Sequence, residues 1–293
     1  MKTVIIIGEN SLINTAADLL NPKEMKLIGF GDTRQELWNV FDEQGEVKEE
    51  ITGLPVMPVE MVASLEPDAV VVAALDREKN EAFKYMLYRS NYFGEVIFLF
   101  DLASQFSVKT SVLRKLSFRL GDQGIAGAAA EVGCGRGDTS WQLNALMPER
   151  KLYLFDTFSG FDARDVAKEQ ELGCSKAEEG QMAYKDENKL LARMVKPEQI
   201  VLKKGWFPET AEAAEDETFA FVYVDACLYN PTFRALEFFF PRMSRGGIIV
   251  LTRYEDDSYN GVFQAVVDFE QKYGNLLMLP LGDLTGTMMV IHP

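Results

Sequence analysis

Residues 128–137 read Ala-Ala-Ala-Glu-Val-Gly-Cys-Gly-Arg-Gly, and the rest of the chain is organised around this stretch. It predicts the end of a buried strand that runs into a glycine-rich turn. Gly133, Gly135 and Gly137 let the backbone turn sharply and approach a ligand closely. Residues 138–140, Asp-Thr-Ser, offer caps for a helix that follows. A strand, a glycine turn and a helix N-terminus together form a cradle for a nucleotide.

The spacing of the glycines indicates which nucleotide. A dinucleotide-binding turn has the pattern Gly-x-Gly-x-x-Gly, which would place its third glycine at Asp138. The observed pattern is Gly-x-Gly-x-Gly, preceded by the acid Glu131. This arrangement resembles the first motif of class I S-adenosylmethionine (SAM) methyltransferases. The alternative is a glycine turn at an ordinary strand–helix junction, because such turns are common.

Length and charge limit the classes of protein to consider. A chain of 293 residues is long enough for two domains, and 47% hydrophobic with 26% charged residues is ordinary for a soluble globular protein. The net charge of −15 argues against nucleic-acid binding, because no run of basic residues interrupts the acidic composition. An acidic surface more often serves solubility.

The cysteines and the single histidine exclude several kinds of site. Cys134, Cys174 and Cys227 form neither a zinc pattern nor a disulfide framework, which favours a reducing cytoplasm. His292 stands next to the end of the sequence, so a histidine dyad or a histidine metal cluster is not expected. No apolar run is long enough to span a bilayer, and the apolar run at the N-terminus stops at Gly8 and is interpreted as a first strand.

Residues 1–102 are expected to form a small doubly wound α/β domain, because strand and helix patterns alternate there. The strands are expected at 4–7, 25–30, 68–74 and 95–100, and the helices at 12–20, after Asp32 through Phe41, at 59–65 and at 80–89.

The first turn of this domain departs from the dinucleotide motif. Asn10 and Ile13 replace the second and third glycines, and Glu9 would repel a pyrophosphate. The domain looks like the Rossmann-like N-terminal domains of bacterial sugar-modifying enzymes. A structural, substrate-positioning or oligomerising role and a ligand site both remain open, and a nicotinamide-dependent activity is disfavoured.

Residues 103–124 are expected to be a linking helix and a hinge, and residues 125–293 a second α/β domain. Its next strand ends at Asp156, about 20 residues after the glycine turn, where an acid accepts the hydroxyls of a ribose. Residues 161–198 are long for a connection, so they are either a mobile lid or substrate-binding insertion or a solvated excursion. Further strands are expected at 151–155, 200–203, 219–224, 248–251, 276–279 and 287–291, the last two as an antiparallel pair.

Several motifs of this second domain occur in one order, and together they resemble the macrocin O-methyltransferase (TylF-type) family over roughly residues 125–291. They are Glu131–Gly137, Phe155–Phe161 (Phe-Asp-Thr-Phe-Ser-Gly-Phe), Lys204–Thr210 (Lys-Gly-Trp-Phe-Pro-Glu-Thr), Val224–Tyr229, Pro241–Gly247 and Gly261–Phe269.

The resemblance implies a class I methyltransferase fold, SAM as methyl donor and a small-molecule acceptor such as a sugar, nucleotide-sugar or glycosylated metabolite. It implies an aromatic wall near the adenine. The residues expected to be catalytic are Asp225 and Tyr254, which the resemblance retains, and Arg253, which stands where the family has an acid. The residues expected to bind the cofactor are Glu131, Gly133, Gly135, Gly137, Asp156, Thr157, Phe158, Gly205, Trp206, Phe207 and Asp225.

The chain departs from the family at the magnesium ligands. Asp225 is kept, but the family's next acid is Cys227, and the family's Asp-Asp pair is Thr252-Arg253. Magnesium prefers several hard oxygen ligands, so no catalytic magnesium is expected. Asp256 and Asp257 lie a few residues after the position of the family's Asp-Asp pair, and helix capping is their expected role.

Arg253 is then expected either to supply the missing positive charge to an anionic acceptor or to pair with an acid such as Glu255. Asp225 is expected to act as the base toward an acceptor hydroxyl. Two functions follow. The first is a cytoplasmic SAM-dependent O-methyltransferase that works without magnesium, away from nucleic acid and membranes, with a homo-oligomer left open. The alternative is a catalytically silent SAM- or nucleotide-binding module.

Overall fold

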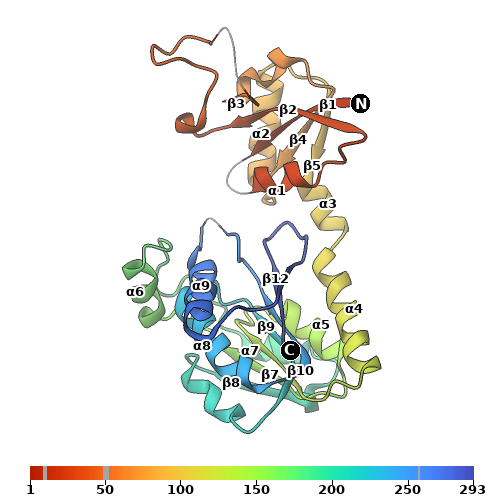
Figure 1. The fold of residues 1–293 in the computed structure, drawn as a ribbon, viewed down its shortest axis with the longest axis vertical. Helices are drawn as coiled ribbons and strands as arrows, with labels where there is room; N and C mark the ends of the chain where they lie inside the picture. The colour runs from red at the N-terminus through yellow and green to blue at the C-terminus, as the bar shows by residue number, and fades with distance from the viewer. Residues whose placement is uncertain (9–11, 49–52, 257) are drawn as a thin grey trace. The chain divides into compact units, whose positions relative to one another are not determined.

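The computed structural model describes residues 1–8, 12–48, 53–256 and 258–293, and it divides into two compact units, Met1–Ser107 and Val108–Pro293 (Figure 1). The first turn at Glu9 and Asn10, and the position Asp257, lie outside the described residues. Each unit is built on one sheet and has its own core.

The first unit is a parallel five-stranded sheet in the order β3-β2-β1-β4-β5. Its central strand carries a continuous β-branched run that is fully buried, which is the pattern of a parallel strand covered on both faces. Its elements are β1 (Lys2–Gly8), α1 (Leu12–Asp18), β2 (Met25–Asp32), η1 (Gln35–Leu37), β3 (Val56–Pro58), η2 (Val59–Leu65), β4 (Ala69–Ala73), α2 (Arg77–Arg89), β5 (Glu95–Phe98) and α3 (Leu99–Gln105).

One expected helix of this unit is wrong. After Asp32 only the short η1 forms, and Val40 instead enters the core at 3% exposure. Phe41 forms an antiparallel bridge with Val47. The apolar spacing that suggested a helix therefore reflects the burial of an irregular segment.

The second unit is a seven-stranded sheet in the order β11-β12-β10-β9-β6-β7-β8, with β12 antiparallel to both of its neighbours. The expected fold class, two doubly wound α/β sheets with an antiparallel final pair, is confirmed. Its elements are α4 (Val108–Asp122), β6 (Ala128–Val132), α5 (Asp138–Leu146), β7 (Leu152–Asp156), α6 (Ala163–Glu171), α7 (Glu187–Ala192), η3 (Pro197–Gln199), β8 (Ile200–Lys204), η4 (Glu209–Ala214), β9 (Phe219–Val224), α8 (Tyr229–Phe239), η5 (Phe240–Arg242), β10 (Met243–Leu251), α9 (Gly261–Tyr273), β11 (Met278–Pro280) and β12 (Met288–Ile291).

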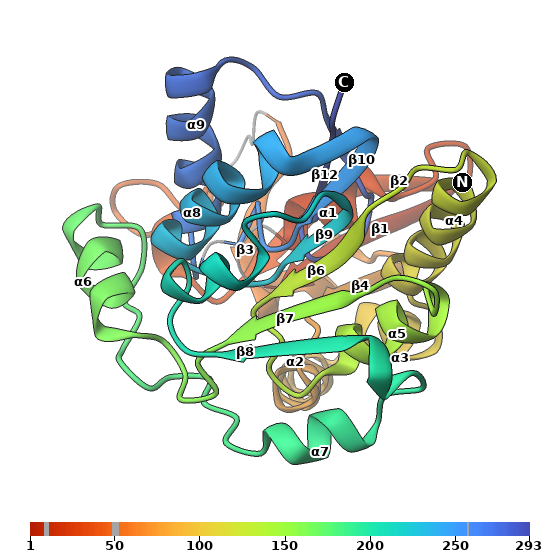
Figure 2. The ribbon, with the colours of Figure 1, turned by 90° about the horizontal axis from the view of Figure 1, so that it is seen from below.

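Helices cover both faces of the second sheet (Figure 2). The aromatic core that includes Phe155, Phe219 and Phe239 lies on the side of α8 and α9. The core on the other face includes Leu113 of α4 and Leu143 of α5, together with residues of α7. Chain order reverses between β6 and β9, which is the point where open α/β sheets bind ligands at the carboxyl ends of their strands.

The stretch expected to link the domains forms two helices, α3 and α4, and α4 belongs to the second unit. No helix among the described residues is long and apolar enough to cross a membrane.

Candidate active site

The glycine turn after β6 needs its glycines. Gly133 has φ of 85°, and a Cβ there would clash with the main-chain carbonyl oxygen of Asp225. Gly137 has φ of 78°, and its Cβ would come within 2.6 Å of the Leu190 side chain. The loops after β6 and β9 therefore pass so closely that only a residue without a side chain fits between them. The N-cap of α5 is Gly137 itself rather than one of the expected polar residues.

Glu131 lies at the base of this turn. It is 1% exposed, and its carboxylate accepts a hydrogen bond from the hydroxyl of Ser140 in α5. Burial raises the pKa of the Glu131 carboxyl well above its usual value, and the hydrogen bond from Ser140 opposes this shift. The residue ties the end of β6 to the first turn of α5.

Asp156 is oriented by two main-chain amides at the carboxyl end of β7. Its Oδ1 accepts from the amide of Phe158 at 2.7 Å, and its Oδ2 accepts from the amide of Gly135 at 2.8 Å. A carboxylate has about four lone-pair positions, so both oxygens retain capacity for the two hydroxyls of a ribose. The Thr157 hydroxyl donates to the carbonyl of Gly160 at 2.6 Å, which shapes the loop beside it.

Trp206 forms one wall of the cavity and is fixed on two sides. Its indole Nε1 donates to both oxygens of Asp165 at 3.0 Å, and the guanidinium carbon of Arg164 lies 3.7 Å from its ring centroid. Asp165 is 5% exposed and also accepts from the side-chain amide of Asn230 at 2.6 Å. Burial raises the pKa of the Asp165 carboxyl, and the bonds from Asn230 and Trp206 oppose this rise.

Phe207 follows Trp206 and anchors this wall in the core. Its ring centroid lies 5.4 Å from that of Phe155 and 5.9 Å from that of Phe239. The expected aromatic residues after β8 therefore line the cavity, and the two rings are held in different ways. Trp206 is held by polar and cationic partners, whereas Phe207 packs at 5% exposure.

The opposite end of the cavity is charged. Oδ1 of Asp225 accepts from the Thr252 hydroxyl at 2.6 Å and lies 3.6 Å from Nε of Arg253. Nη1 of Arg253 donates to Oδ2 of Asp256 at 2.8 Å. Arg253 therefore pairs with nearby acids, Asp256 and Asp225, as one of its two expected roles requires.

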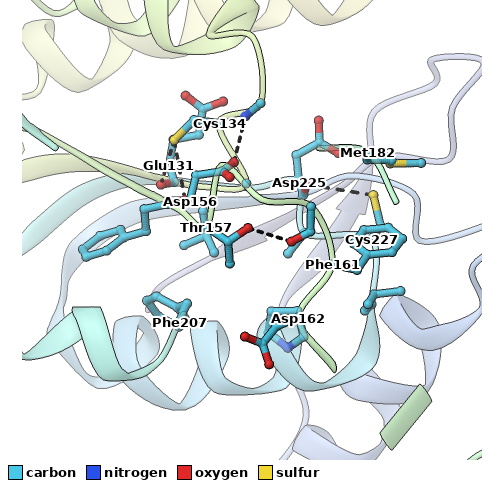
Figure 3. Close-up of a pocket in the computed structure, with 18 of the residues that line it drawn as sticks. Glu131, Cys134, Asp156, Thr157, Phe161, Asp162, Met182, Phe207, Asp225 and Cys227 are labelled. Atoms are coloured by element: carbon cyan, nitrogen blue, oxygen red, sulfur yellow. Dashed lines mark hydrogen bonds between the residues drawn. The ribbon is translucent and has the colours of Figure 1, made fainter. Parts of the chain in front are cut away.

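These residues converge on one cavity of about 280 Å³ (Figure 3). Six acids and two arginines line it: Glu131, Asp138, Asp156, Asp162, Asp165, Asp225, Arg136 and Arg253. The other expected cofactor residues that line it are Gly133, Gly135, Thr157, Gly205, Trp206 and Phe207. An acidic lining of this kind favours a ligand with positive charge.

Three expected site residues do not line the cavity. Phe158 is 2% exposed in the core and contributes its amide to Asp156, and Gly137 packs against Leu190. Tyr254 donates its amide to the carbonyl of Gly286, and its ring centroid lies 5.3 Å from that of Phe263.

The segment at residues 161–198 contributes cavity residues that the sequence pattern did not indicate. Asp162, Asp165 and Met182 line the cavity. The amide of Phe161 donates to the carbonyl of Gln181, and the amide of Gly180 donates back to Phe161. The segment therefore folds over the site, while its mobility stays a prediction. The half-buried indole N–H of Trp206 needs an acceptor, but nothing in the sequence selects Asp165 as that acceptor.

Glu169 in α6 connects this segment to the loops of the site. It is fully buried, its Oε2 accepts from the amide of Tyr229 at 2.7 Å, and its carboxylate lies against Gly261. Tyr229 and Gly261 begin α8 and α9, so one carboxylate lies at the N-termini of two helices. Burial raises the pKa of Glu169.

The residues at this end of the cavity do not fit the magnesium site of the family that the sequence resembles. Burial raises the pKa of the Cys227 thiol to about 12, so it is protonated near neutral pH. Asp225 and Asp256 both lie against Arg253, a permanent cation. Across the described ranges, no three or more His, Cys, Asp or Glu residues come together to hold a metal ion.

The strand order of the second sheet, the glycine turn and the acid at the end of β7 define a class I methyltransferase fold. The macrocin-O-methyltransferase (TylF) family model matches residues 109–288, which is more than half of the chain. The chain belongs to this family. The match includes α4 and leaves the first unit outside.

Individual relatives agree with this assignment. The 8-demethyl-8-(2,3-dimethoxy-alpha-L-rhamnosyl)-tetracenomycin-C 4'-O-methyltransferase of Streptomyces olivaceus is 27% identical over 182 residues. The match covers 56% of this chain and 65% of that protein, so the chain spans just under two thirds of that relative's length.

Two solved structures share the fold. The O-methyltransferase NovP matches with a TM-score of 0.53 at 19% identity, over 63% of this chain and 79% of NovP. The calicheamicin methyltransferase CalS11 matches with a TM-score of 0.50 at 19% identity, over 74% of this chain and 86% of CalS11. At this identity the likeness concerns the fold alone.

Proposed function

We propose that this protein is a SAM-dependent O-methyltransferase that methylates a hydroxyl of a sugar or of a glycosylated small molecule. The observation that carries the proposal is the pairing of the glycine turn with Asp156, whose two oxygens are oriented by the amides of Gly135 and Phe158. That carboxylate receives the ribose hydroxyls of the cofactor. Family membership and the rhamnose-modifying relative support the acceptor class.

The wall at Trp206 takes the adenine. One face of its ring is covered by Arg164, and its Nε1 is held by Asp165, so the indole is oriented before any ligand arrives. A preoriented aromatic surface loses little conformational entropy on binding. Gly205 and Phe207 complete this end of the cavity.

The acidic lining suits the cofactor's charge. When bound, SAM supplies an electrophilic methyl group on a positively charged sulfonium. The acids that line the cavity, Asp156 and Asp225 among them, outnumber its two arginines, so their field favours this cation over a neutral ligand. The same field disfavours a phosphate or carboxylate in the cavity, and we therefore place a neutral hydroxyl-bearing group of the acceptor there.

Asp225 is the general base. Within the described part of the chain, its contacts with Thr252 and Arg253 both fall on Oδ1. Oδ2 is then the oxygen that would accept the proton of the acceptor hydroxyl during methyl transfer, in which the hydroxyl oxygen takes the methyl group and S-adenosylhomocysteine is the product that leaves. Tyr254, which does not line the cavity, supports the loop through its contacts with Gly286 and Phe263.

The experiment is an acceptor screen. The protein is incubated with SAM and a panel of rhamnosides, other glycosides and nucleotide-sugars, and S-adenosylhomocysteine (SAH) release and product mass are measured. Methylation of a sugar hydroxyl supports the proposal. SAM binding without turnover on any acceptor favours the silent binding module instead. Cytoplasmic location, a homo-oligomer and the absence of nucleic-acid binding stay predictions from composition.

A further inference from the structure

The loops that follow two neighbouring strands meet at the acceptor end of the cavity. β9 and β10 are parallel, and Val224 pairs with Leu251 at their carboxyl ends. Asp225 therefore follows one strand beside the loop that carries Arg253 and Asp256. Two carboxylates from two loops face one another across a short gap.

The guanidinium of Arg253 fills that gap. Its Nη1 lies 2.8 Å from Oδ2 of Asp256, and its Nε lies 3.6 Å from Oδ1 of Asp225. The side chains of all three residues are partly buried, with exposures of 36%, 21% and 32% for Arg253, Asp256 and Asp225. The side chain of a protein arginine is always charged, so one fixed positive charge neutralises part of the charge of two carboxylates.

The backbone at this place is strained. Cys227 has φ of 64° and Arg253 has φ of 57°. Left-handed backbone is unfavourable for such residues, and it persists at functional sites where the surroundings hold it. One strained position holds the guanidinium, and the other holds a thiol that is 4% exposed.

We propose that Arg253 is a built-in cation that takes the place of a divalent metal ion between the two loops. Its guanidinium holds the Asp225 carboxylate in position for the acceptor and prevents metal binding there. This inference rests on the proposed function for the role of Asp225. The binding of metal, however, is measurable without any acceptor.

The test is metal binding to the full chain, measured by Mn²⁺ electron paramagnetic resonance and Mg²⁺ calorimetry, each with and without SAH. The native protein is expected to leave the Mn²⁺ signal of free ion unchanged at millimolar concentration. The double variant Cys227→Asp/Arg253→Asp adds two carboxylates beside Asp225 and Asp256. It is expected to bind Mn²⁺ at least about tenfold more tightly than the native chain, because hard carboxylate oxygens are the ligands of such ions.

Two further variants separate the explanations. Arg136→Asp is the control, since Arg136 also lines the cavity and its replacement makes the same charge change as the Arg253→Asp half of the double variant. Arg253→Gly removes the cation, and glycine suits the left-handed backbone at this position. This variant is therefore expected to fold even if the double variant does not. It is expected to gain weaker Mn²⁺ binding, and this gain should disappear when Asp225→Asn is added.

Three results would overturn the inference. The first is Mn²⁺ binding by the native protein that Asp225→Asn abolishes. The second is a gain in Mn²⁺ affinity in Arg136→Asp equal to that of the double variant. The third is no gain in Mn²⁺ affinity in a folded Arg253→Gly or double variant. Retained SAH binding in these variants shows that the cofactor site is intact. A protein that binds neither SAM nor SAH contradicts the proposed function instead, whatever its metal binding.

Discussion

The main-chain amide of Gly135 donates to Oδ2 of Asp156 at 2.8 Å, and this bond joins the turn after β6 to the end of β7. The second oxygen of Asp156 is held by the amide of Phe158. Because both bonds come from the backbone, the carboxylate position depends on loop geometry and not on a flexible side-chain partner. The cofactor end of the cavity is thus formed before a ligand binds.

Gly133→Ala should destabilise the second unit strongly. The added methyl group clashes with the carbonyl of Asp225, and φ of 85° is unfavourable for alanine. We expect a loss of about 2–4 kcal/mol in the free energy of unfolding, measured by denaturant titration. Gly173→Ala is the control, because φ there is 68° but nothing lies within 4 Å, so only about 1–2 kcal/mol of backbone strain applies. Equal losses in the two variants would contradict the close approach of the loops.

Trp206→Phe should cost stability but little cofactor affinity. The variant keeps an aromatic face and removes the Trp206 donor to the buried Asp165, which retains the bond from Asn230. We expect the free energy of unfolding to fall by about 1–3 kcal/mol, while the Kd of SAM, measured by calorimetry, rises less than about threefold. Trp141→Phe, at a tryptophan that is 42% exposed, is expected to change neither. A Trp206→Phe variant as stable as the native chain would show that the bond to Asp165 contributes nothing.

Glu169→Gln should change how stability depends on pH. Burial raises the folded-state pKa of Glu169 above its usual 4.5, so the folded protein binds this proton more tightly than the unfolded chain. The contribution of that proton to stability is present below pH 4.5 and is lost as pH rises through the folded pKa. The stability of the native protein minus that of the Gln variant should therefore decrease from pH 4 towards pH 7. Denaturant titrations at several pH values measure this difference, and a flat or rising difference would contradict it.

Asp225→Asn should separate catalysis from cofactor binding. The amide cannot accept the acceptor proton, so we expect kcat to fall by about 10²–10⁴-fold on any glycoside that the native protein methylates. The Kd of SAM should stay within a few fold. Asp138→Asn is the matched control, since Asp138 lines the cavity but pairs with Arg193, and its kcat should be unchanged. Turnover by the Asn variant close to native would assign the base elsewhere.

The parts of the fold that the sequence predicted are those with local signals. The β-branched run before Gly8 and the aromatic strand that ends at Val224 are buried in one sheet each, so their patterns are continuous. The expected helix through Phe41 failed because burial of an irregular segment can produce helix-like apolar spacing.

In the site too, residues with a local sequence signal were predicted, and residues brought in by long-range contacts were not. Asp156 was predictable because its distance from the glycine turn is set by one strand–helix–strand unit. Asp165 and Met182 reach the cavity because residues 161–198 fold back through long-range contacts that leave no spacing in the sequence. The partners of Arg253 were also open, since the sequence does not show that Asp225 and Asp256 both come within ion-pair distance of its guanidinium.

The most direct test of the account is calorimetric titration of SAM into the native protein and into Asp156→Ala, with Asp216→Ala, an exposed acid before β9, as control. We predict binding at sub-millimolar concentration that is at least about tenfold weaker in Asp156→Ala, since hydrogen bonds to a charged group are worth about 1.5–3 kcal/mol. The control should bind as the native chain does. Absence of SAM binding to the native protein, or equal affinity in Asp156→Ala, would contradict the claim that this cavity is a methyl-donor site.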